Sequence, residues 1–165
     1  MSRKPGKSRS ERVSHVLKIE RWSFDYSFDV GDGRFSSGPY SDIRQIQLNV
    51  RIEKPAIRAK AGLVRLFASE GLVGANEKPR QNFLDNETGK IRPVGHVWYR
   101  GDSYQAVLSF PGDMLGPALT MLSANKYRYV ILVADQGGGE THVHGFTLAE
   151  FHGDEPDLAA SWDDV

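Results

Sequence analysis

Two histidines separated by one residue form the strongest metal-binding pattern in the chain. In His142-Val143-His144 the two imidazoles occupy alternate positions of a predicted strand, so both lie on one face of it. Two ligands do not complete a site, and we consider His96, from a neighbouring strand, and Glu150 as further ligands. The pattern supports one hypothesis, a small metal-dependent enzyme of the barrel type. The alternative is that these histidines are solvent-facing polar residues.

Other catalytic patterns in the sequence are incomplete. Asp25, Asp29 and Asp32, with Asp42 beyond them, suggest a carboxylate cluster for calcium binding or acid–base catalysis. The closing glutamate of a calcium-binding loop is missing, so we expect Asp25 and Asp29 on the wet face of a strand. The chain contains no cysteine and no G-x-S-x-G motif. These absences favour a non-catalytic protein, and no cofactor is predicted beyond the divalent metal ion of the histidine hypothesis.

The two ends of the chain carry opposite charge, although 21 lysines and arginines balance 21 aspartates and glutamates overall. We expect residues 1–13 to form a flexible basic arm that could contact the phosphates of single-stranded nucleic acid. The basic residues of this arm are Arg3, Lys4, Lys7, Arg9 and Arg12.

Residues 153–165 form an acidic tail in which Leu158 and Trp162 would share one face of a short helix. Three alternatives stay open for this tail: docking on the parent domain, docking on a sister subunit or another protein, and disorder. The segment 70–94 has no periodicity, so we interpret it as a functional loop or a partly disordered connection. The binding residues predicted in this segment are Lys78, Arg80, Lys90 and Arg92.

The clearest local pattern is an alternation of large apolar and small polar residues, which predicts a strand. The apolar positions are Trp22, Phe24, Tyr26, Phe28 and Val30. The apolar residues that precede them are out of phase, which predicts a bulge near Glu20. If these rings faced outward they could stack on nucleotide bases, but burial in the core is the simpler outcome, and the preference for a catalytically silent protein depends on it.

The remaining periodicities predict several further strands and one short helix at 113–124. The further strands are expected near 45–53, 63–68, 95–100, 104–110, 127–134 and 143–151. This pattern indicates a mainly β domain at 14–152, either an antiparallel β-sandwich, which we favour, or a sheet curled into a partly open barrel. No apolar run approaches the roughly 18 residues that span a bilayer, so no membrane contact is expected and the cytoplasm is the expected compartment.

The favoured function is a non-catalytic binding or assembly protein that acts through the sheet surface, the 70–94 loop and the charged termini. A protein partner or self-association into an oligomer is expected. The metal-dependent enzyme and the single-stranded nucleic-acid binding protein are the alternatives.

Overall fold

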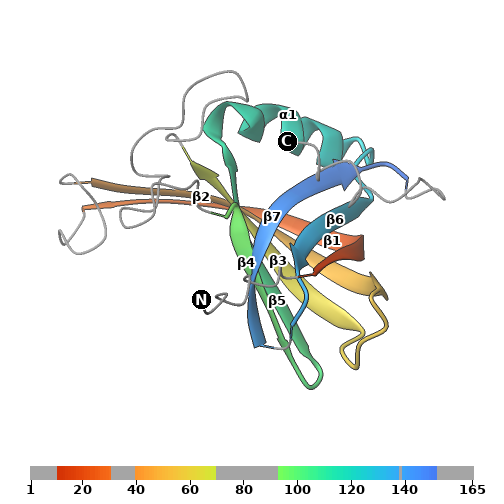
Figure 1. Cartoon of the computed structure of the whole chain (residues 1–165). Coiled ribbons are helices and arrows are strands. Elements are labelled where there is room, and N and C mark those ends of the chain that lie inside the picture. Colours follow the sequence, from red (N-terminus) through yellow and green to blue (C-terminus); the bar gives the residue numbers. More distant parts are fainter. Residues whose placement is uncertain (1–10, 31–39, 70–92, 138, 152–165) are drawn as a thin grey trace, which may run out of the picture.

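The computed structural model describes residues 11–30, 40–69, 93–137 and 139–151 (Figure 1). They form seven strands and one short helix, which is preceded by a 3-10 turn at Gly112–Met114. The elements are β1 (Arg12–Val30), β2 (Tyr40–Lys54), β3 (Ala61–Ser69), β4 (Gly95–Arg100), β5 (Ser103–Pro111), α1 (Leu115–Ser123), β6 (Tyr129–Asp135) and β7 (Gly139–Ala149). The mainly β class and the single helix expected near 113–124 are confirmed.

The seven strands belong to one sheet that closes on itself in a ring. Their order is β1-β2-β3-β5-β4-β7-β6, and β6 pairs in turn with β1. Only β3 and β5 run parallel, while every other neighbouring pair is antiparallel. Two arrangements were expected from the sequence, a sandwich of two stacked sheets and a single curled sheet. The observed ring agrees with the curled sheet and not with the sandwich. The parallel pair also makes the sheet mixed.

The core fills the inside of the ring with alternate residues of every strand. Leu48 of β2, Val64 of β3, Leu108 of β5 and Leu132 of β6 are fully buried there. Helix α1 lies across one end of the ring and buries Ala118 and Leu122 in the same core (Figure 1). Alternating strands and one apolar helix face are thus enough to seal the interior.

Local turn chemistry agrees with the sequence pattern at three positions. Gly101, at the β4–β5 hairpin, has a φ of 58°, a conformation that glycine adopts without strain. Pro117 lies in the first turn of α1, where its missing N–H has no partner to lose. Asn125, with a φ of 55°, follows the helix in the left-handed conformation, which asparagine tolerates better than most residues.

At the predicted bulge in β1, the inward-facing positions change from odd-numbered to even-numbered residues. Leu17 points into the ring, whereas the pairing with β2 shifts between Ile19 and Arg21. Beyond this shift the even-numbered residues continue the interior face, because Trp22 pairs with Leu48 and Phe24 with Ile46. The bulge expected near Glu20 is confirmed.

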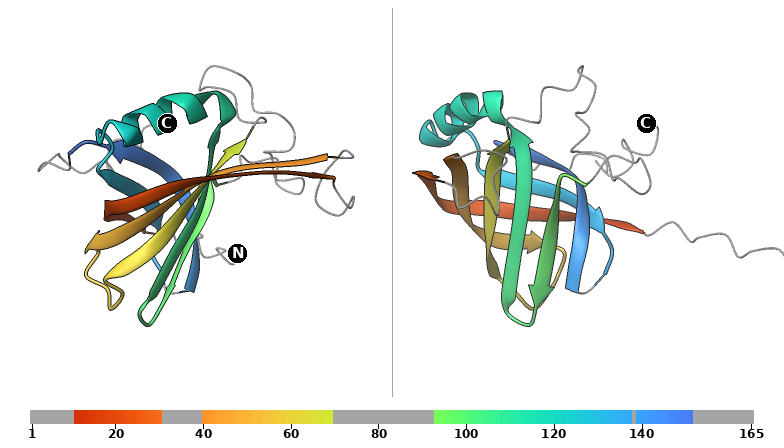
Figure 2. Two further views of the ribbon diagram at one scale, coloured as in Figure 1. Left: turned by 180° about the vertical axis from the view of Figure 1, so that it is seen from behind. Right: turned by 90° about the vertical axis from the view of Figure 1, so that its left-hand side faces the viewer.

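Beyond the bulge, β1 and β2 leave the ring as a long two-stranded projection (Figure 1; from behind in Figure 2). We call residues 21–30 of β1 and the paired residues 40–49 of β2 the ribbon. Its base, residues 45–49 of β2, still pairs with β3 and belongs to the ring, while its outer part projects from the ring. The prediction that the rings of this segment lie in the core is wrong, since Trp22, Phe24, Tyr26 and Phe28 are all exposed. Among the residues that the structure describes, no second layer covers these side chains.

The predicted division into arm, domain and tail is only partly within the described residues. Strand β1 begins at Arg12, inside the segment 1–13 that was expected as an arm. Residues 1–10 of that segment lie outside the described residues. The predicted tail 153–165 lies outside them as well. In the part of the chain that the structure describes, no helix is long and apolar enough to cross a membrane.

Gly62 provides a test of how closely the ring is packed. A Cβ atom at Gly62 would lie 2.7 Å from both the carbonyl oxygen and the Cδ1 atom of Tyr104. We expect Gly62→Ala to lower the free energy of unfolding by about 1–3 kcal/mol, because backbone and a buried ring must both move. In urea unfolding, the matched variant Gly116→Ala in α1, where nothing lies within 4 Å, should be neutral or slightly stabilising. Equal effects of the two substitutions would contradict the close contact.

Candidate functional site

One face of the ribbon gathers most of the exposed aromatic side chains of the described chain. We call it the aromatic face, and it consists of Trp22, Phe24, Tyr26, Phe28 and Val30 of β1 with Tyr40, Asp42 and Arg44 of β2. The register brings these residues together, since Tyr26 lies opposite Arg44, Phe28 opposite Asp42 and Val30 opposite Tyr40. Directly opposed residues of an antiparallel pair project on the same side, so the residues form one continuous surface.

The exposure of this face rises with distance from the ring. Trp22 and Phe24 are 36% and 38% exposed, Tyr26 and Phe28 are both 58% exposed, and Val30 reaches 79%. Ile46, on the same face where the ring begins, is completely buried. The aromatic face is therefore an outward continuation of the core surface.

Two side-chain contacts hold the outer part of the aromatic face in place. The rings of Phe28 and Tyr40 stack across the strands with centroids 5.4 Å apart and an angle of 18° between their planes. The Arg44 guanidinium donates to both carboxylate oxygens of Asp42, with 3.2 Å from Nε to Oδ1. This fork-shaped pair neutralises the two charges on the face.

The opposite face of the ribbon is polar. Asp25 accepts a hydrogen bond from the Gln47 amide at 2.5 Å, and Ser23 and Ser27 lie on the same side. Ile43, opposite Ser27, is the large apolar residue of this face and is 42% exposed. The ribbon is thus amphipathic across its thickness, as a sheet that covers an apolar surface is.

The ribbon also has open strand edges among the described residues. Strand β6 pairs with β1 only from Arg12 to Lys18, and β3 pairs with β2 only from Gln45 to Arg51. Residues 21–30 of β1 and 40–44 of β2 therefore have one described strand neighbour each, namely the other strand of the ribbon. A partner can approach this part of the molecule without meeting a flanking strand.

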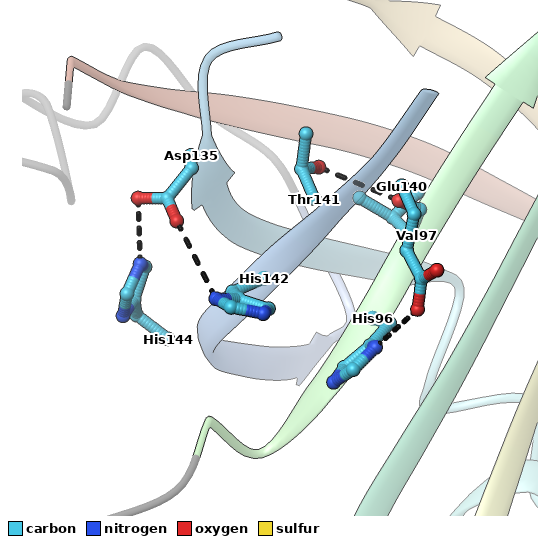
Figure 3. Close-up of polar contacts among 7 residues, drawn as sticks. All are labelled: His96, Val97, Asp135, Glu140, Thr141, His142 and His144. Carbon is cyan, nitrogen blue, oxygen red and sulfur yellow. Dashed lines mark hydrogen bonds and ion pairs between the residues drawn. The ribbon is translucent and has the colours of Figure 1, made fainter. Parts of the chain in front are cut away.

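A second group of polar residues, the histidine cluster, lies on the outside of the ring across β4, β6 and β7 (Figure 3). The rings of His96 and His142 pack 5.1 Å apart, because these residues face each other in the β4–β7 pairing. His96 Nδ1 contacts Glu140 Oε1 at 2.6 Å, and His144 Nε2 contacts Asp135 Oδ1 at 2.8 Å. His142 Nδ1 lies 4.0 Å from the other Asp135 oxygen. Each histidine thus faces a carboxylate.

The structure places the proposed metal ligands in two locations. His96, His142 and His144 do come together, whereas Glu150 forms an ion pair with Lys126 at 3.2 Å. Within the described residues, no group of three or more His, Asp or Glu side chains is arranged to hold a metal ion. Metal binding through His142 and His144 stays a prediction.

The other carboxylates noted in the sequence do not converge, as far as the structure describes them. Asp25 and Asp29 lie on the polar face of the ribbon, as expected, and Asp42 lies on the aromatic face beside Arg44. Asp32 lies outside the described residues. The described carboxylates of this group are therefore divided between two faces.

The third group of residues, which contains His15, Tyr99 and Tyr104, lies inside the ring of strands. His15 is completely buried, and its Nδ1 lies 3.1 Å from the Tyr104 hydroxyl, while its Nε2 has no described hydrogen-bond partner. Tyr99 packs against both residues and donates a hydrogen bond to the Gly137 carbonyl at 2.6 Å. Burial lowers the pKa of His15 from 6.5 to about 4, and burial, with a smaller contribution from Tyr99, raises the pKa of Tyr104.

Most of the binding residues predicted from the sequence lie outside the described residues. Arg12 is described and exposed at the start of β1. The predicted residues that lie outside are Arg3, Lys4, Lys7, Arg9, Lys78, Arg80, Lys90, Arg92, Leu158 and Trp162.

Sequence reasoning missed the exposure of the aromatic face, although one signal pointed to it. The apolar pattern from Val16 to Val30 is far longer than the usual strand of about five or six residues. A strand of 19 residues, as β1 proves to be, cannot lie entirely within a small ring. Its excess length had to leave the ring.

The ribbon and the ring should respond differently to truncation of an apolar residue on the same face. We expect Phe28→Ser to lower the free energy of unfolding by less than about 1 kcal/mol, because this ring is largely exposed. Leu48→Ala, in the buried part of the face, should cost about 2–5 kcal/mol. Urea unfolding at low protein concentration, where association does not contribute, measures both. A loss of stability at Phe28 as large as the loss at Leu48 would mean that the phenyl side chain of Phe28 is buried.

His15 should make the protein sensitive to acid. Its folded pKa lies below the unfolded value, so the stability that neutral His15 contributes is complete above pH 6.5 and is lost as the pH falls toward 4. Between pH 7 and pH 4, the free energy of unfolding in urea should fall in both proteins. We expect the fall in the variant His15→Leu/Tyr104→Phe to be smaller than that of the wild type by roughly 2–3 kcal/mol. Equal decreases in the two proteins would show that His15 takes up its proton without cost to the fold.

Comparison with family models, with curated proteins and with solved structures gives no match to this chain. Of the three groups of residues described above, the aromatic face has the least reason to remain in water.

Proposed function

We propose that this chain is a non-catalytic binding or assembly protein, and that its contact surface is the aromatic face of the ribbon. The observation that carries the proposal is the exposure of Tyr26 and Phe28, each 58%, on a two-stranded projection. The sequence pattern made the preference for a catalytically silent protein depend on burial of these rings, and that support is lost. Their exposure supports the same function for a different reason, because it supplies a surface.

The area of the aromatic face supports a binding role. Aromatic side chains bury about 150–250 Å² each, so five of them exposed at 36–58% leave on the order of 500 Å² in contact with water. This area lies within the range of the largest apolar patch of a typical monomer, about 300–600 Å², and patches of this size are often functional. Enrichment in tyrosine and tryptophan is also typical of protein interfaces.

The charge of the ribbon favours a protein partner over nucleic acid. Its ionisable residues are Asp25, Asp29 and Asp42 against Arg21 and Arg44, which gives 2 − 3 = −1. Stacking proteins that bind single strands combine their aromatic residues with a positive groove. Arg12, the described basic residue of the predicted arm, is ten residues before Trp22 on β1, roughly 33 Å along the strand.

The polar groups of the aromatic face suit recognition better than chemistry. They are the Asp42–Arg44 ion pair, the hydroxyl groups of Tyr26 and Tyr40, and the indole N–H of Trp22. Covalent catalysis by a side-chain hydroxyl needs an activating group such as an adjacent base, and the described residues of this face include no hydroxyl hydrogen-bonded to a base. An aromatic ring with a polar tip, in contrast, suits a contact that is partly wet.

A photo-crosslinking experiment tests this proposal. p-Benzoylphenylalanine is introduced at position 28 of the full chain, and in a matched variant at position 43 on the opposite face. We expect illumination in a cell extract to give a discrete protein adduct from position 28 and none from position 43, because only the aromatic face is in contact. Mass spectrometry identifies the adduct, and position 24 should yield the same species.

Three outcomes contradict the proposal. The first is that neither position gives a discrete adduct, which would leave the aromatic face without a partner. The second is that both positions give the same adducts, which would indicate random collision. The third is an adduct that nuclease removes, which would favour the nucleic-acid alternative.

A further inference from the structure

We infer that the aromatic face binds the aromatic face of a second copy of this chain, so that two ribbons pack face to face about a two-fold axis. The inference rests on the proposed function and names its partner. Four properties of the described ribbon support it: its area, its charge, its shape and its limited stability as a single layer.

The area of the aromatic face fits an isologous dimer, in which each chain contributes the same patch. Burial of the exposed rings on both chains would remove on the order of 1,000 Å² from water, twice the estimate for one face, and Val30 would add to it. Specific interfaces begin at about 1,200 Å² in total. The two faces therefore come close to the lower end of this range, as expected for a weak dimer that depends on concentration.

The charge of the aromatic face is complementary to itself. Asp42 and Arg44 are the two ionisable residues of opposite charge on it, and they already form an ion pair within each chain. A strongly charged partner would find no net charge to bind. A second copy presents an equally neutral apolar surface, and in a two-fold arrangement the Asp42 of one chain can meet the Arg44 of the other with opposite sign.

The shape of the ribbon allows the approach and lowers its cost. The ribbon projects from the ring, as seen from the front in Figure 1 and from behind in Figure 2. The ribbons of two chains can therefore approach to the usual spacing of packed sheets, about 10 Å. The stacked rings of Phe28 and Tyr40 are already ordered. Preordered side chains lose less conformational entropy on binding than free ones do.

A two-stranded ribbon with one apolar face also needs a second layer. Isolated two-stranded hairpins are marginally stable in water, and stability requires more strands or packing against another element. Among the described elements, the ring covers the base of the aromatic face but not its outer part, where Val30 is 79% exposed. The ribbon of a second chain supplies a layer of the same length and pattern.

Sedimentation equilibrium of the purified full chain over a wide concentration range tests the inference. We expect a reversible monomer–dimer equilibrium that the double variant Tyr26→Ser/Phe28→Ser weakens by roughly thirtyfold or more, the effect of losing interface hot-spot residues. The matched control, Ile43→Ser, removes an apolar residue from the opposite face of the same ribbon and should leave the dimer unchanged. Circular dichroism and urea unfolding check that the monomers of all variants fold equally well.

The possible results separate this inference from the proposed function. A chain that stays monomeric at every concentration, or a dimer that the double variant leaves intact, overturns the second copy as the partner. If position 28 then crosslinks to a different protein in the extract, the proposed function stands without self-association. A monomer that also gives no discrete crosslink contradicts both.

Discussion

The register shift between Ile19 and Arg21 is the constraint on which the rest of the structure depends. A shift of one residue turns every following side chain of a strand to the other face. In β1 this change keeps the apolar residues on the inner side as the strand leaves the ring, so that Leu17 and Trp22 face the same way despite their opposite parity. Without it, Asp25 and Asp29 would continue the core surface and the aromatic rings would lie on the polar side.

One apolar face therefore experiences two environments along its length. Inside the ring, Leu48 is surrounded by the interior residues of other strands and is fully buried. In the ribbon, Phe28 lies on the same face, and the described part of the chain gives it one neighbouring strand and no opposing layer, so more than half of it stays in contact with water. The aromatic face is core surface in composition and solvent-exposed by position. This contrast is the physical reason for assigning it a partner of similar apolar character.

The polar residues divide in a comparable way between the inside and the outside of the ring. His15 is enclosed with Tyr104 and is held neutral by burial, which makes it a cost to the fold in acid. His96, His142 and His144 lie on the outer surface with carboxylate partners. Exposed pairs of this kind contribute little to stability, because water already solvates their charges. The histidines of the ring thus differ in role according to the parity of their strand positions.

Much of the fold was encoded in local patterns of the sequence. The alternation from Trp22 to Val30, the bulge before it, the Gly101 hairpin and the short helix ending before Asn125 each depend on residues close together in the chain, and each is present. The histidine pattern likewise placed His142 and His144 on one face of a strand. What only the tertiary structure decided is which strands are neighbours: the parallel β3–β5 pair, the approach of His96 to His142, and the end of the β1–β6 pairing at Lys18. Periodicity determines which side of a strand is apolar, but the burial of that side depends on elements distant in sequence, and for the ribbon no such element is present among the described residues.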